Sequence, residues 1–210
     1  MVSPKTCIPL LESGDRLTRE EFHRRYLARP DIKKAELVEG VVYVPSPARF
    51  DLHGEPHANI VCWLGTYKAR TPGVRLGDNA TVILDADNEV QPDAFLMREA
   101  PGGPRLTEEH YIEGAPQLIV EVAASSATYD LHDKMEAYRR TGVREYVVWR
   151  VLDGMIDWFR LREGRYVWIE PDADGVVESE IFPGLRLNVP RMLAGDLAGV
   201  LAELERAASG

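Results

Sequence analysis

Apolar positions along this 210-residue chain change spacing several times, from a helical period to strand-like runs and back. A capping box at Thr18–Glu21 precedes apolar residues at helical spacing, which predicts a helix over residues 19–29 that ends before Pro30. Gly142 ends a second helical stretch, because glycine readily adopts the left-handed conformation that closes a helix. Helical spacing predicts further helices over residues 57–67, 128–141 and 192–207.

Short apolar runs without a helical period predict the strands. Residues 35–44 predict a β-hairpin with its turn at Glu39-Gly40. Residues 117–123 are almost continuously apolar, which is typical of a strand buried on both faces. With the helix that follows and a strand at 145–151, this run predicts a right-handed crossover unit. Other strand-like segments are residues 81–84, 90–97, 156–161, 166–170 and 176–182, and the last three predict an antiparallel meander.

The order of these elements predicts a mixed α/β fold, in which a central mixed sheet is flanked by helices and an antiparallel meander lies toward the C-terminus. The pattern contains no internal repeat and no long linker, so we expect an N-terminal tail over residues 1–17 and a single domain over residues 18–210. No apolar run approaches the ~18 residues of a membrane span, so we expect no membrane segment.

Charge and cysteine content narrow the function classes. The chain has 25 Lys and Arg against 34 Asp and Glu, a net charge of −9, which disfavours a protein that coats nucleic acid with a broad cationic surface. A nuclease is still compatible, because a bound divalent cation offsets the charge of an acidic centre. Cys7 and Cys62 form no CxxC pair, which argues against a disulfide scaffold or a structural zinc site. We therefore expect a reducing, cytoplasmic location.

Two acidic residues in apolar, strand-like surroundings are the strongest chemical signal. Asp93 directly follows Pro92 and precedes an apolar run, and Glu121 has aliphatic neighbours on both sides. A buried carboxylate must be neutral, paired or bound to a cation, because burying it alone costs several kcal/mol. Two carboxylates that converge from neighbouring strands suit Mg²⁺ or Mn²⁺. Taken singly, Asp93 also fits a turn or cap residue, and Glu121 also fits one half of an ion pair.

The pair Pro92-Asp93, with Glu121 following 28 residues after Asp93, resembles the active-site signature of the PD-(D/E)XK nuclease superfamily. More closely, the chain resembles the bacterial Uma-two family of restriction endonucleases over residues 18–189. This resemblance implies a restriction-endonuclease-like fold. The matching segments are Glu36–Gly40, Asn88–Asp93, Gly114–Val122, Ser125-Ser126, Tyr129-Asp130, Lys134, Tyr138, Gly142–Tyr146 and Phe182–Leu185.

The resemblance implies a Mg²⁺-dependent endonuclease that hydrolyses DNA phosphodiester bonds. Its metal ligands would be Asp93, Glu121 and Glu36, and these three with Lys134 would be the catalytic residues. The superfamily places a lysine two residues after the second acid, where this chain has Ala123, and the resemblance points to Lys134 of the following helix as the replacement. The residues expected to contact substrate or to order the site are His57, Asp130 and Ser125.

Several alternatives stay open at the level of the sequence. Lys134 also fits a solvated ion pair with Asp130, four residues before it, and Glu36 also fits an exposed strand residue. The replacement at Ala123 supports a second hypothesis, a catalytically degenerate nuclease fold that acts as a binding or regulatory module. A third hypothesis is a nuclease that acts on RNA or nucleotides. We expect Tyr138 to serve in packing.

A two-fold assembly is a further expectation. Nucleases that cut both strands of a duplex often present two sites related by a two-fold axis, and the C₂ dimer is the commonest soluble assembly. Residues 156–168 include Trp158, Phe159, Tyr166 and Trp168, more aromatic surface than a small sheet easily covers. We therefore expect a homodimer, formed through this region or through the terminal helix.

Overall fold

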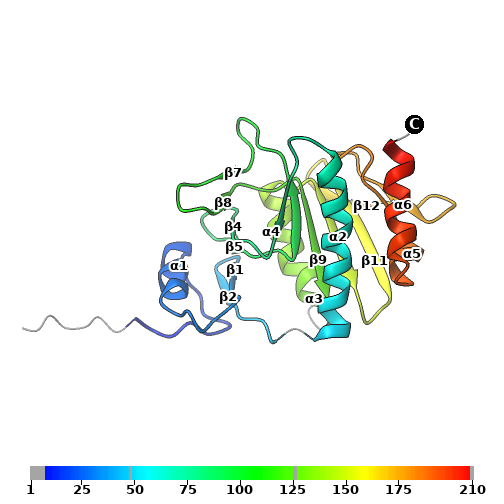
Figure 1. Cartoon of the computed structure of the whole chain (residues 1–210). Helices are drawn as coiled ribbons and strands as arrows, with labels where there is room; N and C mark the ends of the chain where they lie inside the picture. Colours follow the sequence, from blue (N-terminus) through cyan, green and yellow to red (C-terminus); the bar gives the residue numbers. More distant parts are fainter. Residues whose placement is uncertain (1–7, 48, 125–126, 209–210) are drawn as a thin grey trace, which may run out of the picture.

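The computed structural model describes residues 8–47, 49–124 and 127–208, and in this part of the chain two mixed sheets lie side by side (Figure 1). A separate small hairpin and several helices complete the fold. The mixed α/β class predicted from the sequence is confirmed, although two sheets take the place of one central sheet. The chain passes between the two sheets several times, and one of these passages, from β5 to β6, lies at residues 91–93.

The first sheet contains the predicted N-terminal hairpin, whose turn is at Glu39-Gly40 as expected. Its pairs are antiparallel except for β4 with β8, which run parallel. In spatial order its strands are β2 (Val41–Tyr43), β1 (Glu36–Val38), β5 (Glu89–Val90), β4 (Val82–Ile83), β8 (Ile112–Glu113) and β7 (Arg105–Leu106).

The second sheet contains the predicted crossover unit. Strands β9 and β10 pair in parallel, with Glu121 opposite Val148, and the other pairs are antiparallel. In spatial order its strands are β12 (Arg165–Trp168), β11 (Met155–Arg162), β10 (Glu145–Arg150), β9 (Leu118–Ala123), β6 (Ala94–Met97) and β3 (Arg75–Asp78), and the small hairpin pairs β13 (Val176–Glu178) with β14 (Arg186–Asn188).

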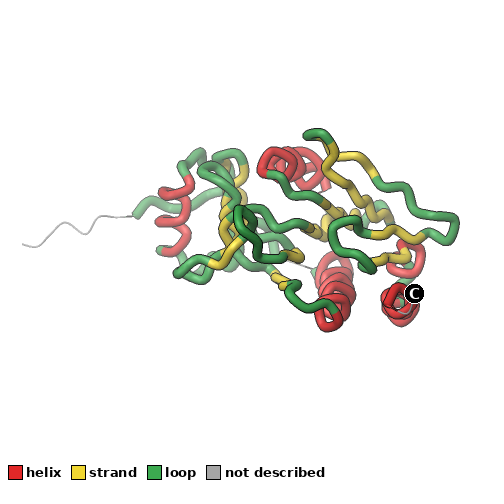
Figure 2. The backbone as a smooth tube through the Cα atoms, turned by 90° about the horizontal axis from the view of Figure 1, so that it is seen from above, coloured by secondary structure: helices red, strands yellow, loops and turns green. Residues whose placement is uncertain are grey.

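Helices cover both faces of the second sheet, as Figure 2 shows from above. Helix α2 packs on one face together with α5 and α6, and α4 packs on the other. The helices are α1 (Arg19–Leu27), α2 (Glu55–Arg70), α3 (Ala127–Tyr129), α4 (Met135–Thr141), α5 (Val189–Leu193) and α6 (Leu197–Ala208), with π-helical segments η1 (Phe50–Gly54) before α2 and η2 (Asp130–Lys134) before α4.

Strand β9 sends alternate side chains to opposite faces of the sheet, because successive residues of a strand point in opposite directions. Leu118, Val120 and Val122 join the core beneath α2, whereas Ile119 and Ala123 join the core beneath α4. Glu121 shares the parity of these last two residues and therefore points toward α4. The predicted burial of this strand on both faces is confirmed, since every residue of β9 is buried.

The segment 90–97, predicted as one strand, is two strands in two different sheets. Pro92 has no backbone N–H to donate to a strand ladder, and its ring fixes the local backbone. The N–H of Gln91 instead donates to Glu36 Oε1 at 2.8 Å, and that of Asp93 donates to Glu121 Oε2 at 3.4 Å. The prediction was wrong because these two acidic side chains satisfy the backbone where the strand breaks.

Two predictions for the C-terminal part also need correction. The meander keeps β11 and β12, but β13 pairs with β14 rather than with β12. Residues 179–182 form a turn, because Ser179 Oγ accepts the N–H groups of Ile181 and Phe182. The predicted terminal helix is divided into α5 and α6 by Gly195, which has φ 74°, and Asp196 then caps α6.

Two other sequence-based expectations concern the surface and the N-terminus. Of the aromatic side chains expected at a dimer interface, Trp158 is buried, whereas Trp168 on the edge strand β12 is half exposed. Within the predicted N-terminal tail, Leu11 is buried and Arg16 forms a bridge to Val41 of β2. Among the described helices, none has the length and apolar character needed to span a membrane.

Candidate active site

Four acidic side chains and a lysine predicted as site residues gather where the two sheets meet. Glu36 comes from β1 of the first sheet and Glu121 from β9 of the second. Asp93 lies at the passage between the sheets, whereas Asp130 and Lys134 lie on η2. All five are buried, so the alternative of an exposed Glu36 is excluded.

Lys134 is the centre of this group. Its ammonium lies 2.6 Å from Glu121 Oε1, 3.0 Å from Glu36 Oε1 and 3.8 Å from Asp130 Oδ1, with only 2% of its side chain exposed. The alternative of a solvated ion pair between Lys134 and Asp130 is therefore wrong. Burial opposes the charged form of the lysine, but the surrounding carboxylates outweigh it and raise the pKa of Lys134 well above its usual value.

The position of Ala123 explains why the lysine can come from a helix. Ala123 lies two residues after Glu121 and on the same face of β9, the face that α4 covers. A lysine there would point toward the space under α4, where Lys134 already brings an ammonium to Glu121. The positive charge is thus present beside the second acid, although it comes from a different element.

Tyr138 contributes more than packing. Its hydroxyl donates to Glu121 Oε1 at 2.8 Å, one turn beyond Lys134 on the same helical stretch. Burial raises the pKa of Glu121 to about 8; Lys134 opposes this rise, and the nearby Asp93, Asp130 and Glu36 add to it. Without a metal, burial therefore favours the protonated form of Glu121 near neutral pH.

Asp93 has a different set of partners. Its Oδ1 accepts from Lys34 Nζ at 2.9 Å and lies 3.7 Å from His53 Nε2, and its Oδ2 accepts the Val122 N–H at 2.8 Å. Burial acts to raise the pKa of Asp93, but the charges of Lys34, His53 and Lys134 outweigh it and hold the pKa below its usual value. The pKa of Asp93 is therefore lowered, whereas the pKa of Glu121 is raised.

His57 also lies beside Asp93. Its Nε2 lies 2.9 Å from the main-chain oxygen of Asp93 and 3.1 Å from Asp78 Oδ1. The rings of His53 and His57 stack with centroids 5.5 Å apart, since the two residues lie four apart where η1 joins α2. His53 Nδ1 donates to the Val122 carbonyl at 3.1 Å, which ties η1 to the end of β9.

Lys34 and His53 are the site residues that sequence reasoning missed. Lys34 precedes Glu36 by two residues, so in an extended segment the two side chains share a face, and this spacing could have indicated it. His53 has no such local signal, because its contact with Asp93 depends on tertiary structure. Ser125 lies outside the described residues.

The donor set has the chemistry of a Mg²⁺ site but is not a complete cage. Within residues 8–47, 49–124 and 127–208, no three His, Cys, Asp or Glu side chains are grouped so as to hold a metal ion. Asp93 and Glu121 nevertheless lie together, since the Asp93 N–H reaches Glu121 Oε2 at 3.4 Å. Mg²⁺ is commonly held by one or two carboxylates with water and substrate phosphate completing its shell, so this pair fits it.

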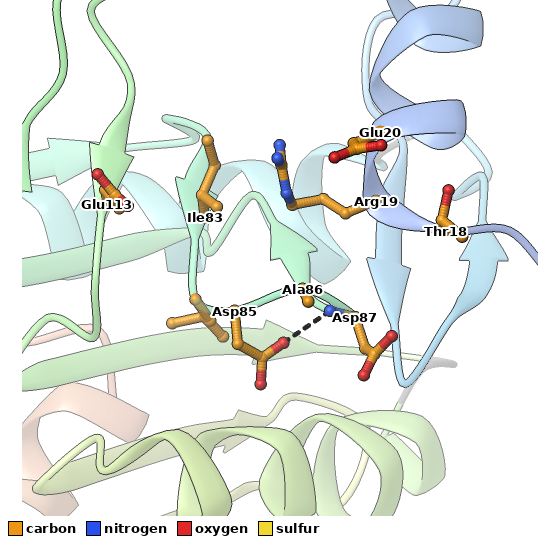
Figure 3. Close-up of a pocket in the computed structure, with 9 residues that line it drawn as sticks. Thr18, Arg19, Glu20, Ile83, Asp85, Ala86, Asp87 and Glu113 are labelled. Carbon is orange, nitrogen blue, oxygen red and sulfur yellow. Dashed lines mark hydrogen bonds between the residues drawn. The ribbon is translucent and has the colours of Figure 1, made fainter.

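A separate surface hollow of about 530 Å³ lies between α1 and the first sheet (Figure 3). Its lining includes Glu20, Asp85, Asp87 and Glu113, with Arg19 as the basic member. This acidic lining repels a phosphodiester, and none of the central acids belongs to it. The hollow is therefore distinct from the candidate active site.

Comparisons with known proteins identify the family of the chain and a similar fold. The model of the Uma2 family, described as "Putative restriction endonuclease", matches residues 19–190. The fold is similar to the crystal structure of "a putative nuclease belonging to DUF820" from Anabaena variabilis ATCC 29413, with 14% identity, a TM-score of 0.62, and coverage of 81% of this chain and 96% of that one. No curated protein matches the chain. With the family model covering most of its length, this chain belongs to the Uma2 family.

Proposed function

We propose that the chain is a metal-dependent endonuclease that hydrolyses DNA phosphodiester bonds, with Mg²⁺ or Mn²⁺ held by Asp93 and Glu121. The observation that carries this proposal is the meeting of these two acids with a buried lysine at the junction of the sheets. Family membership supports the nuclease class. The metal, the DNA substrate and the cleavage itself are the parts to be tested.

The chemistry needs hard oxygen ligands beside a scissile phosphate. A bound divalent cation polarises a phosphoryl oxygen and lowers the pKa of a coordinated water. Asp93, whose pKa is below its usual value, is ready to act as an anionic ligand. Glu121 has to lose its proton to do the same, and its pKa of about 8 makes ligand formation dependent on pH.

Lys134 supplies the fixed positive charge. In a buried setting an ammonium stabilises negative charge that develops on the phosphate far more than it does in water. Tyr138 and Lys134 together hold Glu121 Oε1, which leaves Oε2 with the longer contact to the Asp93 N–H. The free side of Glu121 is thus the side nearest Asp93.

Glu36 acts in this proposal mainly through the lysine. Its two oxygens accept from Lys134 Nζ at 3.0 and 3.1 Å, and Oε1 also accepts the Gln91 N–H. As a third metal ligand, the role implied by the family resemblance, Glu36 would have to give up one of these contacts. The position of Glu36 suits two other roles. It holds the Lys134 ammonium, and it accepts the Gln91 N–H where the strand breaks.

A second candidate function is a binding or regulatory module without turnover. The observation that favours it is that Lys134 pairs with Glu36 and Glu121, and Lys34 pairs with Asp93, so each of these three acids has a basic partner without a metal ion. Such a module need not bind Mg²⁺ between Asp93 and Glu121.

Cleavage of supercoiled plasmid separates these functions. We expect purified wild-type protein to nick or linearise the plasmid with Mg²⁺ or Mn²⁺ but not with EDTA, and D93N and E121Q to be inactive. K33Q is a matched control, because the exposed Lys33 ammonium donates to the Pro30 carbonyl and, among the described residues, has no hydrogen bond or ion pair with the central acids. Cleavage of RNA alone would favour the ribonuclease alternative, and no cleavage of plasmid, linear, branched or RNA substrates would contradict the proposal.

A further inference from the structure

The basic side chains around the central acids are divided by their access to solvent. Lys134 is closed off, with 2% of its side chain exposed, whereas Lys34 is 24% exposed, His53 25% and His57 16%. These three come from different segments and lie around Asp93. A substrate that reaches Asp93 from solvent therefore meets Lys34 and the two histidines before it meets Lys134.

Lys34 also keeps hydrogen-bonding capacity. A lysine ammonium has three donors, and within the described part of the chain the acceptors of Lys34 Nζ are Asp93 Oδ1 at 2.9 Å and Asn79 Oδ1 at 3.1 Å. Asn79 and Asp93 hold the ammonium at the mouth of the site while one donor is left for another acceptor. An anionic oxygen beside Asp93 is the natural partner.

Residues other than Lys34 also hold the Asp93 carboxylate in place. The Val122 N–H fixes Asp93 Oδ2, and His53, itself tied to the Val122 carbonyl, stands near Oδ1. The carboxylate thus keeps its orientation from β9 and η1. The partly exposed Lys34 ammonium adds a contact at the open edge that can be shared with a ligand.

We propose that Lys34 is a phosphate-binding residue, which donates to a non-bridging oxygen of a DNA phosphodiester seated over Asp93. This inference rests on the proposed function and adds to it a substrate contact outside the acidic motif and Lys134. Lysine binds phosphate as a point charge, so the contact adds affinity without sequence preference.

Fluorescence anisotropy with a fluorescein-labelled 20-base-pair DNA duplex tests this contact. The full chain is titrated in Ca²⁺, which takes oxygen ligands as Mg²⁺ does, over a range of salt concentrations. The variants are K34Q, K34R and K33Q, the last as a matched loss of charge at the neighbouring residue. Urea denaturation of each variant reports folding separately.

For K34Q we expect binding about tenfold weaker at low salt, with the slope of log K against log salt reduced by about one. K34R should retain most of the affinity, and K33Q should match wild type. K34Q that binds with the affinity and salt slope of K33Q would overturn the inference, as would a loss of stability with unchanged binding by the folded fraction.

Cleavage of the same duplex in Mg²⁺ keeps this inference distinct from the proposed function. If wild type binds the duplex in a Lys34-dependent way but does not cut it, the nuclease proposal fails and the phosphate contact stands. If wild type cuts and K34Q cuts with unchanged KM, only the contact at Lys34 is contradicted. Absence of any duplex binding by wild type would contradict both.

Discussion

The two halves of the site differ in how far solvent reaches them and in what their charges do. In the inner half, one ammonium is shared among carboxylates away from water. In the outer half, one carboxylate is shared among basic groups at the surface. The inner half consists of Lys134, Glu36, Glu121 and Tyr138, and the outer half consists of Asp93, Lys34, His53 and His57.

Because of this difference, we expect the two halves to contribute unequally to stability and to substrate binding. A buried ion pair that loses one partner leaves an uncompensated charge, whereas an exposed pair contributes little because water and salt screen it. The inner half should therefore dominate the folding energetics, and the outer half should dominate substrate binding. Glu121 and Asp93, one on each side, join the halves through the contact at Asp93 N–H.

The largest expected effect is at Lys134. K134M leaves Glu36 and Glu121 without their shared cation, and we expect the free energy of unfolding to fall by about 3–5 kcal/mol. K34M, the equivalent change in the outer half, should cost less than half as much, because its ammonium is partly solvated. Urea denaturation in EDTA measures both. Equal losses would contradict the division of the site.

The second effect separates activity from stability at Glu121. E121Q keeps an oxygen for Tyr138, and Lys134 keeps Glu36, so at pH 5, where Glu121 of the folded wild type is protonated, the unfolding free energy should change by less than about 1 kcal/mol. Plasmid cleavage should nevertheless fall at least about a hundredfold, because a charged ligand is lost. If E121Q unfolds while wild type shows no detectable metal affinity by calorimetry, Glu121 has a structural role and the catalytic assignment fails.

The third effect is a pH dependence of the stability of the folded protein, which comes from Glu121. Its pKa rises from 4.5 in the unfolded chain to about 8 in the folded protein, so the native state holds an extra proton between these values. The associated stability is complete below pH 4.5 and is lost as pH rises through about 8. Thermal melts in EDTA from pH 5 to 8.5 should show wild type losing Tm relative to E121Q. Parallel curves would contradict this assignment.

The smallest effect tests the hydroxyl of Tyr138. Y138F removes one donor to Glu121 Oε1 while Lys134 remains, so we expect a loss of about 1 kcal/mol. Because the donor favours the charged carboxylate, its removal should also shift the pH dependence of Mg²⁺ affinity to higher pH. Y67F is the matched control, since Tyr67 donates to the Pro183 carbonyl away from the acids. The same pH shift in Y67F would show that the effect is not specific to Glu121.

Much of this architecture could be predicted from the spacing of apolar residues and from the residues that end helices and strands. The first hairpin, the buried strand β9 and the helix ended by Gly142 follow from their patterns, and Gly142 adopts φ 90° as a left-handed cap. The strand break at Pro92 was missed, although proline within the run was a signal against a continuous strand. What replaces the ladder there depends on Glu36, a residue distant in sequence.

The candidate active site could likewise be predicted from the sequence only in part. Asp93 and Glu121 were identifiable as acids in apolar strands, and their meeting is a consequence of adjacent strands β6 and β9. That Lys134 would be buried against both Glu36 and Glu121 could not be derived from its spacing to Asp130. Local spacing predicts contacts within one helix or strand, whereas this cluster depends on the packing of two sheets against η2.

A crystal soaked with Mn²⁺ shows directly whether Asp93 and Glu121 share a divalent cation. We expect an anomalous difference peak about 2.1 Å from an oxygen of each acid, which disappears in a crystal of E121Q. A peak only in the acidic hollow lined by Glu20, Asp85, Asp87 and Glu113 (Figure 3), or no peak at saturating Mn²⁺, would contradict it.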